Sequence, residues 1–342
     1  MKRIFALVLV FALLTGCAAP VRQTDTTQQY TATFLTLFDT VTTIIGRAES
    51  EETFREISQS IHDDLQYYHE RFDIYNDYEG VNNIKTINDN AGIAPVKVDQ
   101  AIIDLLLDCK SYYELTGGRV NVAMGSVLQL WHEARNDGVN DPQNATLPDM
   151  EDLYEAAKHC DFDGVVIDEV ASTVYIQNPD MRLDVGAIAK GWATQRAAEN
   201  APAGMLISVG GNVCATGPKL SDGTPWVIGI QDPDAADKNL HTIFVTENSV
   251  VTSGDYQRTY WVEGKSYHHI IDPDTLMPAA YWRSVSIVCS DSGLADALST
   301  ALFLMDRETG AALAQKCGVE VLWVAADGTE YMTDGFEKML RT

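Results

Sequence analysis

Apolar residues recur at intervals of three and four along residues 51–72, which is the spacing of one face of an α-helix. Glu51 and Glu52 occupy the first turn, where carboxylates interact favourably with the helix N-terminus. The sequence therefore predicts a helix whose core-facing residues are Phe54, Ile57, Ile61, Leu65, Tyr68 and Phe72. A second helix is predicted from the N-cap residue Asp99 to Tyr113, ahead of the helix-ending pair Gly117-Gly118.

The later part of the chain has the short apolar runs of a β-rich region. These runs cover residues 206–209, 226–230, 242–245, 285–288 and 319–324, and a helix is predicted at residues 295–317. The polar, turn-rich residues 136–148 predict a surface loop. Strands in blocks, without regular strand and helix alternation, indicate an α+β fold with a mixed or antiparallel sheet and flanking helices.

The N-terminus has the layout of a bacterial secretory signal. Two basic residues precede an apolar run at residues 4–14, which at about 11 residues is too short for the ~30 Å hydrocarbon core of a bilayer. Leu14-Thr15-Gly16-Cys17 resembles a lipobox, in which cleavage leaves a lipid-modified cysteine. We therefore expect a signal peptide at residues 1–16, a lipid anchor on Cys17, and attachment to the extracytoplasmic face of the cell membrane. The alternative is an ordinary signal peptide with an incidental cysteine.

Residues 17–33 are rich in Thr and Gln and lack an apolar period, so they predict a flexible tether. The globular body is expected at residues 34–342, a length that supports a substantial core. A formal net charge of −25 excludes nucleic acid as a partner, and any phosphate ligand would need a cation. The cysteines after Cys17 are odd in number and lack C-x-x-C spacing, which argues against a disulfide framework or a metal knuckle.

Three segments carry side chains that suit ligand binding or catalysis. In the first, Asp184 and Lys190 place opposite charges around Gly186 and Gly191 at a predicted helix start. This arrangement suits a phosphate next to the edge of a nucleotide ring. A capped helix with a surface lysine would show the same pattern.

The second segment, residues 252–256, is followed by His268 and His269 at a predicted strand end. One ring would face inward, where a neutral imidazole could deprotonate a hydroxyl, although a core histidine is the alternative for at least one of them. Zinc is disfavoured because no third ligand is evident. In the third segment Asp296 and Thr300 share a helix face and offer oxygen ligands that suit Mg²⁺, unless Asp296 simply caps the helix.

In this order, the segments resemble the FAD:protein FMN transferase family, also called the ApbE family. The resemblance runs from about Leu35 to the C-terminus and includes residues 37–40, 72–88, 124–131, 184–193, 209–212, 226–233, 252–256, 268–273 and 295–302. It implies a T-fold-like α+β body with FAD in a cleft. The implied reaction is Mg²⁺-dependent transfer of FMN to a Ser or Thr hydroxyl of an extracytosolic flavoprotein acceptor, such as a quinone-oxidoreductase subunit, with release of AMP.

The resemblance also implies roles for individual residues. The flavin and its adenosine would contact Phe38, Tyr75, Val122, Ala123, Met124, Asp184, Lys190, His269 and Ile270. The metal would be held by the carbonyl of Ala187 together with Asp296 and Thr300. His269, or failing it Asp255, is the expected base for the acceptor hydroxyl.

The chain departs from the family pattern at four positions. Asn121 and Ala123 stand where many relatives have Asp and Thr, Trp192 replaces a common Tyr, and Leu276 replaces a usual turn glycine. Two other functions fit the same residues. One is hydrolysis of FAD to FMN and AMP, and the other is a flavin-binding lipoprotein without turnover.

Overall fold

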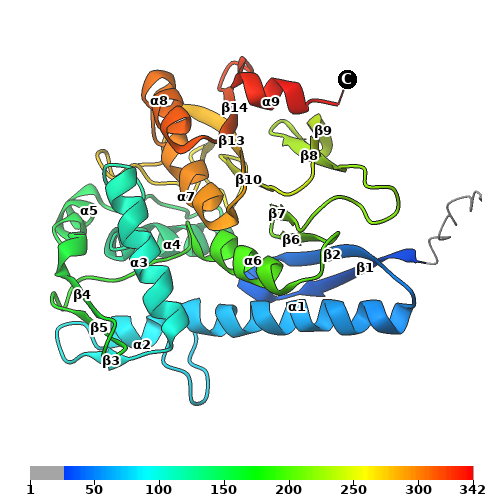
Figure 1. Cartoon of the computed structure of the whole chain (residues 1–342). Coiled ribbons are helices and arrows are strands. Elements are labelled where there is room, and N and C mark those ends of the chain that lie inside the picture. Colours follow the sequence, from blue (N-terminus) through cyan, green and yellow to red (C-terminus); the bar gives the residue numbers. More distant parts are fainter. Residues whose placement is uncertain (1–26, 342) are drawn as a thin grey trace, which may run out of the picture.

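The computed structural model describes residues 27–341, and its centre is an eight-stranded sheet whose neighbouring strands are all antiparallel (Figure 1). In spatial order the strands are β1 (Gln28–Leu35), β2 (Val41–Ala48), β6 (Leu206–Val209), β7 (Asn212–Ala215), β10 (Ser249–Gly254), β13 (Trp282–Cys289), β14 (Glu320–Ala325) and β15 (Glu330–Met332). This sheet and the helices packed on it confirm the predicted α+β fold. The signal peptide, Cys17 and the tether as far as residue 26 lie outside the described residues.

Helices α1 (Glu51–Phe72), α6 (Ala189–Asn200) and α7 (Ser292–Phe303) form a layer on one face of the sheet, followed by α8 (Arg307–Cys317). The other face carries the hairpin of β8 (Trp226–Asp232) and β9 (Ala235–Val245) and the short helix α9 (Asp334–Met339). Strands β13 and β14 therefore bury side chains on both faces. Burial on both faces explains why their sequences are continuous apolar runs instead of an alternating pattern.

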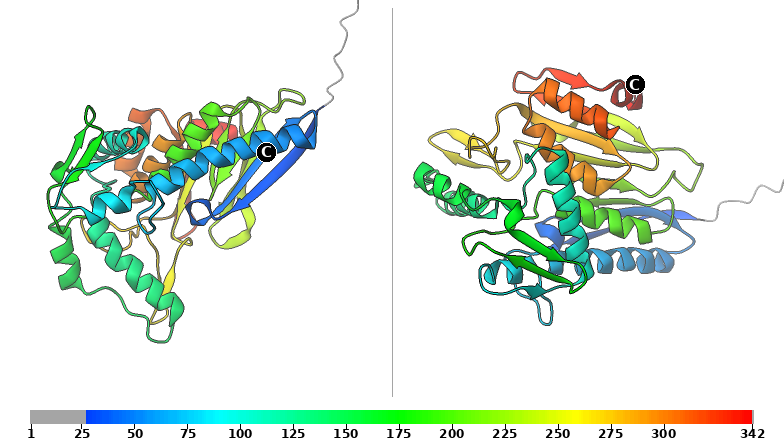
Figure 2. Two further views of the ribbon diagram at one scale, coloured as in Figure 1. Left: turned by 90° about the horizontal axis from the view of Figure 1, so that it is seen from below. Right: turned by 60° about the vertical axis from the view of Figure 1, so that its left-hand side comes forward.

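A second group of elements packs beside the C-terminal end of α1 (Figure 2). It contains α2 (Ile84–Asp89), α3 (Gln100–Leu115), α4 (Gly125–Asn140), α5 (Met150–Ala157), the sheet β3 (Val96–Lys97), β5 (Thr173–Ile176) and β4 (Val165–Asp168), the turn η2 (Phe162–Gly164), and the hairpin β11 (Tyr260–Val262) and β12 (Lys265–Tyr267). One hydrophobic core continues through both groups. None of the helices formed by residues 27–341 has the length and apolar character needed to cross a bilayer.

Helix α1 has the bounds and the buried face that its periodicity predicts. Ser50 caps its N-terminus by accepting a hydrogen bond from the Thr53 N–H at 3.1 Å. Ile61 and Leu65 are fully buried between the helix and the sheet. The second predicted helix is α3, and Asp99 is its N-cap residue, but the Asp99 carboxylate pairs with Arg71 of α1 instead of with the helix backbone.

The predicted tether is wrong at its C-terminal end, because β1 begins at Gln28. All of β1 pairs with β2, and Tyr30 stacks on Phe54 of α1 with ring centroids 5.5 Å apart. An edge strand is covered on one side only, so polar residues can alternate with a few apolar ones, and its sequence is then hard to distinguish from a linker.

Two further boundaries differ from the prediction. The predicted loop at residues 136–148 begins only after α4 ends at Asn140. The predicted helix at 295–317 is two helices, because α7 ends at Phe303 and α8 starts after Asp306. The Asp306 carboxylate accepts the Thr309 N–H at 3.0 Å, which is the hydrogen bond expected of an N-cap and starts a new helix there.

Candidate active site

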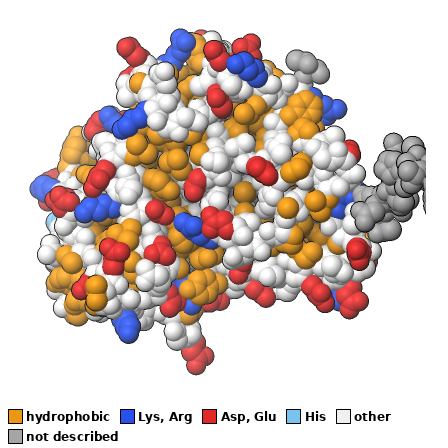
Figure 3. Space-filling model, in the orientation of Figure 1, with side chains coloured by type: hydrophobic (Ala, Val, Ile, Leu, Met, Phe, Trp, Pro, Cys, Tyr) orange, Lys and Arg blue, Asp and Glu red, His pale blue; other side chains and the backbone are white. Residues whose placement is uncertain are grey.

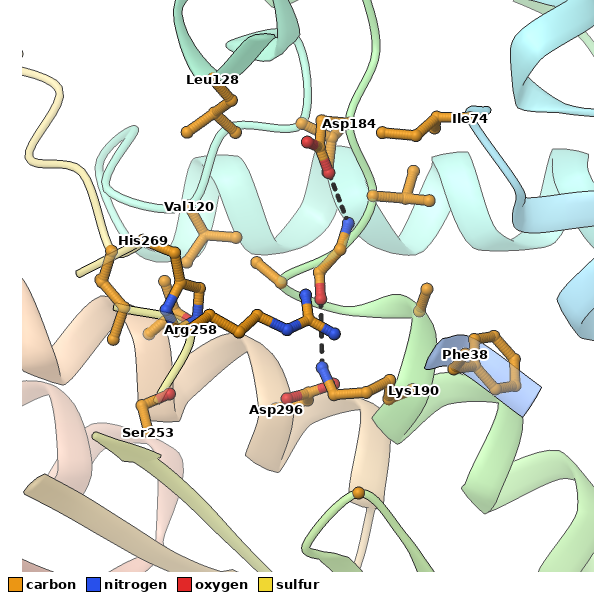
Figure 4. Close-up of a pocket in the computed structure, with 18 of the residues that line it drawn as sticks. Phe38, Ile74, Val120, Leu128, Asp184, Lys190, Ser253, Arg258, His269 and Asp296 are labelled. Atoms are coloured by element: carbon orange, nitrogen blue, oxygen red, sulfur yellow. Dashed lines mark hydrogen bonds and ion pairs between the residues drawn. The ribbon is translucent and has the colours of Figure 1, made fainter. Parts of the chain in front are cut away.

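A cavity of about 490 Å³ lies where the end of α1 and the starts of α4 and α6 meet α7 and strand β10 (Figure 4). Its wall contains all but two of the site residues predicted in the globular body. Those present are Phe38, Tyr75, Val122, Met124, Asp184, Ala187, Lys190, His269, Ile270, Asp296 and Thr300. Residues from distant parts of the chain are therefore gathered into one site.

Asp184 organises the turn that leads into α6. Its Oδ1 accepts the Gly186 N–H at 2.8 Å, and its own N–H donates to the Val122 carbonyl at 2.8 Å. On its other side, Oδ2 lies 3.9 Å from His132 Nε2, while His132 Nδ1 lies 2.9 Å from the Tyr75 hydroxyl. Burial lowers the pKa of His132 and raises the pKa of Tyr75 to about 12, so both side chains are neutral near pH 7.

Gly191 allows α6 and α7 to approach each other beside the cavity. Its N–H donates to Asp296 Oδ2 at 2.8 Å, a contact that links the two helices. Gly191 lies in the first turn of α6, where backbone N–H groups have no partner within the helix, so the Asp296 carboxylate satisfies one of them. Lys190 Nζ lies 3.9 Å from the same Asp296 oxygen and donates to the Gly186 carbonyl at 3.2 Å. The Lys190 ammonium therefore lies between the Gly186 carbonyl and the Asp296 carboxylate, and Ala187 lines the same cavity.

Asp296 and Thr300 both line the cavity from α7, as their four-residue spacing predicts. Asp291 is the N-cap residue of this helix, so Asp296 has no capping role. Burial raises the pKa of Asp296, and the nearby Lys190 ammonium and Gly191 N–H oppose that rise. Residues 27–341 contain no group of three or more His, Cys, Asp or Glu side chains placed to hold a metal. A cation here would therefore depend on one carboxylate, neutral oxygens and the ligand itself.

The adjacent histidines have different surroundings. His268 is buried, its Nε2 donates to the Ala279 carbonyl at 2.9 Å, and its Nδ1 accepts the Ile270 N–H at 3.2 Å. It is the core histidine of the pair. His269 lines the cavity, and its Nδ1 donates to the Gln257 carbonyl at 3.2 Å, which leaves Nε2 as the acceptor nitrogen.

The pKa of His269 is lowered to about 3, firstly by burial and then by the positive charges of Arg258 and Lys190. The imidazole is therefore neutral throughout the physiological range. Its Nδ1 proton is held by the backbone, so the lone pair on Nε2 can accept a proton from a hydroxyl group.

Two predicted site residues do not line the cavity. The Asp255 carboxylate pairs with Arg283, with Oδ2 2.7 Å from Nε, which disfavours its predicted role as a substitute base. This ion pair anchors the end of β10 to β13. Ala123 is fully buried and its N–H donates to the Asn121 side chain at 2.9 Å. The Ala123 side chain therefore lies in the core, while its neighbours Val122 and Met124 line the cavity.

The sequence reasoning missed Arg258, which reaches with Lys190 into the same part of the cavity (Figure 4). Within the part of the chain that the structure describes, its guanidinium makes no hydrogen bond or ion pair. Its backbone φ of 48° is in the left-handed region, which non-glycine residues seldom adopt. A conformation of this kind at a cavity wall favours a functional position. The one sequence signal for Arg258 is its position two residues after the segment of residues 252–256.

These two cations stand out against the rest of the molecule. Acidic side chains are spread over the face shown in Figure 3, in agreement with the net charge of −25. A second arginine in the wall, Arg119, is engaged by Asp272 at 3.3 Å and Asp274 at 2.7 Å. Local positive charge at Lys190 and Arg258 therefore makes the cavity suitable for a phosphate ligand despite the acidic surface.

Comparison with known proteins gives consistent results. A family model described as the ApbE family matches residues 33–323. The FAD:protein FMN transferase of Treponema pallidum (strain Nichols) is 36% identical over 263 residues, which cover 71% of each chain. The FAD:protein FMN transferase of Klebsiella pneumoniae (strain 342) is 31% identical over 248 residues, covering 70% of this chain and 74% of the relative.

A solved structure has the same fold. The crystal structure of the ApbE protein of Thermotoga maritima superposes with a TM-score of 0.81 and 31% sequence identity. The match covers 92% of this chain and all of the other. The flavin transferase ApbE from Vibrio cholerae, at 23% identity and a TM-score of 0.75, adds a second example of the fold.

Proposed function

The chain belongs to the ApbE family, and from this premise we propose that it transfers the FMN half of FAD to a Ser or Thr hydroxyl of an acceptor protein, releasing AMP. In this reaction the hydroxyl oxygen forms a bond to the FMN-side phosphorus. The bond from that phosphorus to the bridging oxygen breaks, AMP departs with the bridging oxygen, and the hydroxyl proton must be removed.

The observation that carries the proposal is the arrangement of His269, Lys190 and Arg258 around one cavity. A neutral imidazole with a free Nε2 faces the same space as two cations. The cations can hold a pyrophosphate, and the imidazole can accept the proton of an incoming hydroxyl.

The rest of the wall suits the two ring systems of FAD. Phe38 and Tyr75 supply aromatic surface, and Val122, Met124 and Ile270 supply apolar surface. Asp184 supplies a carboxylate that can accept hydrogen bonds from a ring N–H. Pockets for cofactors are commonly built in this way, with apolar walls and a few placed polar groups.

The oxygen atoms that α7 and the start of α6 bring to the cavity fit Mg²⁺. A single buried carboxylate on Asp296, the hydroxyl of Thr300 and the carbonyl of Ala187 are oxygen ligands of the type that Mg²⁺ uses when phosphate oxygens complete its coordination. When bound, the ion would neutralise charge that develops on the phosphate oxygens. Lys190 contacts the same carboxylate, so it holds the Asp296 charge in place beside the phosphates.

His269 has the orientation of a base but an unusually low pKa in the ligand-free protein. Binding of a polyanion beside Lys190 and Arg258 would offset their positive charges, which are two of the causes of the lowered pKa. We therefore expect the pKa of His269 to rise when FAD binds, which brings the imidazole closer to the value that favours proton transfer.

We also propose that the protein acts outside the cytoplasm as a lipid-anchored enzyme on the cell membrane. Support comes from the lipobox-like segment ending at Cys17. An anchored enzyme would meet acceptors at the same surface, such as extracytosolic flavoprotein subunits of quinone oxidoreductases. Its negative charge makes nucleic acid an unsuitable partner.

The test is incubation with FAD, Mg²⁺ and an extracytosolic acceptor protein, followed by a denaturing gel. Transfer leaves the acceptor band fluorescent, because the phosphoester bond survives unfolding. An acceptor with Ala in place of the hydroxyl residue is the matched control and should stay dark. Free FMN without a fluorescent band would assign the protein to FAD hydrolysis instead.

A further inference from the structure

Two aromatic residues of the cavity wall, Phe38 and Tyr75, are held by hydrogen bonds that lead to one carboxylate, that of Asp73 at the end of α1. We propose that Asp73, Tyr78 and His69 form a positioning relay that fixes both aromatic residues for flavin binding. This inference rests on the proposed function, since it assigns the relay to the affinity of the same site for FAD.

The turn that carries Phe38 needs such support. The turn η1 (Leu37–Asp39) joins β1 to β2. Two of its residues and the preceding Thr36 have left-handed backbones, with φ of 52° at Phe38, 53° at Asp39 and 116° at Thr36. Such conformations persist only where surrounding contacts stabilise them. The Phe38 N–H donates to His69 Nδ1 at 3.2 Å, and the two rings meet edge to face with centroids 5.4 Å apart.

This contact defines the tautomer of His69. Because Nδ1 accepts the Phe38 N–H, the ring proton of the neutral imidazole must be on Nε2. His69 Nε2 lies 3.2 Å from the Tyr78 hydroxyl, and that hydroxyl donates to Asp73 Oδ2 at 2.7 Å. Each group therefore has one role, and the chain of donors runs from Phe38 through His69 and Tyr78 to Asp73.

Asp73 also holds the other aromatic residue. Its Oδ1 accepts the Tyr75 N–H at 2.6 Å and the Asn76 N–H at 3.1 Å, and its Oδ2 accepts the Asn76 side chain at 2.9 Å. The Tyr75 hydroxyl then reaches His132 on α4. Burial raises the pKa of Asp73, but these hydrogen bonds outweigh burial and lower it, so the carboxylate stays charged.

The hydrogen bonds of the relay do not involve the charged groups proposed to hold the phosphates. They link His69, Tyr78 and Asp73 to one another and to the segments that carry Phe38 and Tyr75, and none of them reaches Lys190, Asp296 or Arg258. Loss of the relay should therefore weaken flavin binding and leave the chemical step intact. This separation of KM from kcat distinguishes a positioning role from a general loss of structure.

The experiment compares His69→Ala with His69→Asn, Tyr78→Phe and the control His62→Ala. Asn can place its Oδ1 near the position of Nδ1, and Phe keeps the Tyr78 ring while removing its hydroxyl. His62 lies two turns earlier on α1 and is not part of the cavity wall. Its ring packs against Phe34 at a tilt, with ring centroids 4.5 Å apart. The measurements are FAD affinity by fluorescence titration, KM and kcat of transfer, and amide hydrogen exchange of residues 36–40.

For His69→Ala we expect about tenfold weaker FAD binding, the loss of one hydrogen bond in a constrained site, with kcat changed less than about twofold. Exchange at residues 36–40 should accelerate. His69→Asn should recover most of the affinity, Tyr78→Phe should fall between, and His62→Ala should match the wild type. If Tyr78→Phe is folded and His69→Ala is not, the FAD affinity and exchange rates of Tyr78→Phe test the proposal.

Unchanged FAD affinity in His69→Ala, or an equal fall in kcat in all three relay variants, would overturn the proposal. Faster exchange with unchanged affinity would also overturn it, because the turn would then be held without any effect on the flavin. A wild-type protein that binds FAD but labels no acceptor would refute the proposed transfer and leave the relay to be judged on affinity and exchange. If the wild type binds no FAD, the proposed function and the relay both fail.

Discussion

Replacing Gly191 by Ala tests the packing that places Asp296 in the cavity wall. A Cβ at this position would lie 2.3 Å from the Ser292 carbonyl oxygen and 2.5 Å from the Asp296 Cβ. Both atoms belong to α7, and neither is the end of a flexible side chain, so the helices must separate. Overpacking of this kind costs about 1–3 kcal/mol, against about 1 kcal/mol gained from the better helix propensity of Ala.

Gly310→Ala in α8 is the matched control. Gly310 is also a buried helical glycine, but an added Cβ would meet no atom closer than 3.6 Å. At this position the substitution changes little except the helix propensity, so we expect the free energy of unfolding to rise by up to about 1 kcal/mol. The same substitution should thus have opposite signs at the two positions.

The assay is urea unfolding of both variants, combined with the Mg²⁺ concentration that gives half-maximal release of AMP. Gly191→Ala should lose up to about 2 kcal/mol of unfolding free energy and need a higher Mg²⁺ concentration, because Asp296 moves with α7. Gly310→Ala should reach half-maximal release of AMP at the same Mg²⁺ concentration as the wild type. If Gly191→Ala is as stable as Gly310→Ala and has wild-type metal dependence, the close packing of α6 on α7 does not determine the position of Asp296 in the cavity wall.

Three further predictions concern single residues. Asp296→Asn should stay folded and lose most Mg²⁺-dependent release of AMP, since the amide keeps the shape but not the charge; wild-type rates at limiting metal would rule out the site. The pKa of His269 is lowered in the folded protein to about 3 from an unfolded value near 6.5, so the unfolded state binds the extra proton as pH falls through this window. Wild-type stability should therefore fall by about 2 kcal/mol from pH 7 to pH 5 relative to the same fall in His269→Asn, measured by urea unfolding, and parallel pH profiles would contradict the burial of His269. Cys17→Ser should leave the protein unlipidated and move it out of the membrane fraction of its host with catalysis intact, whereas a native protein found without lipid would refute the anchor.

The sequence predicted best those features that depend on local periodicity. The stripe from Phe54 to Phe72 places α1 correctly because an amphipathic helix needs only one partner surface. The spacing of Asp296 and Thr300 placed both on one face of α7 for the same reason. Strand β1 escaped detection because its residues around Tyr30 alternate weakly at a sheet edge.

Features that depend on contacts between distant segments were missed. Arg258 belongs to no periodic pattern, and its direction is set by a left-handed backbone that the sequence does not announce. His69 looks like an ordinary residue of an amphipathic helix until η1 brings Phe38 against it. Asp255 was predicted as a substitute base within the segment of residues 252–256, but the antiparallel pairing of β10 with β13 places its carboxylate next to Arg283.

The central claim is that the nucleophile is a protein hydroxyl and not water. The most direct measurement is to count AMP released and acceptor modified in the same reaction, by chromatography and by intact-protein mass spectrometry. The proposed function predicts one AMP for each acceptor that gains the mass of FMN less one water, and neither product when the acceptor hydroxyl residue is replaced by Ala. AMP formed at the same rate without any change in acceptor mass would contradict it and identify hydrolysis of FAD.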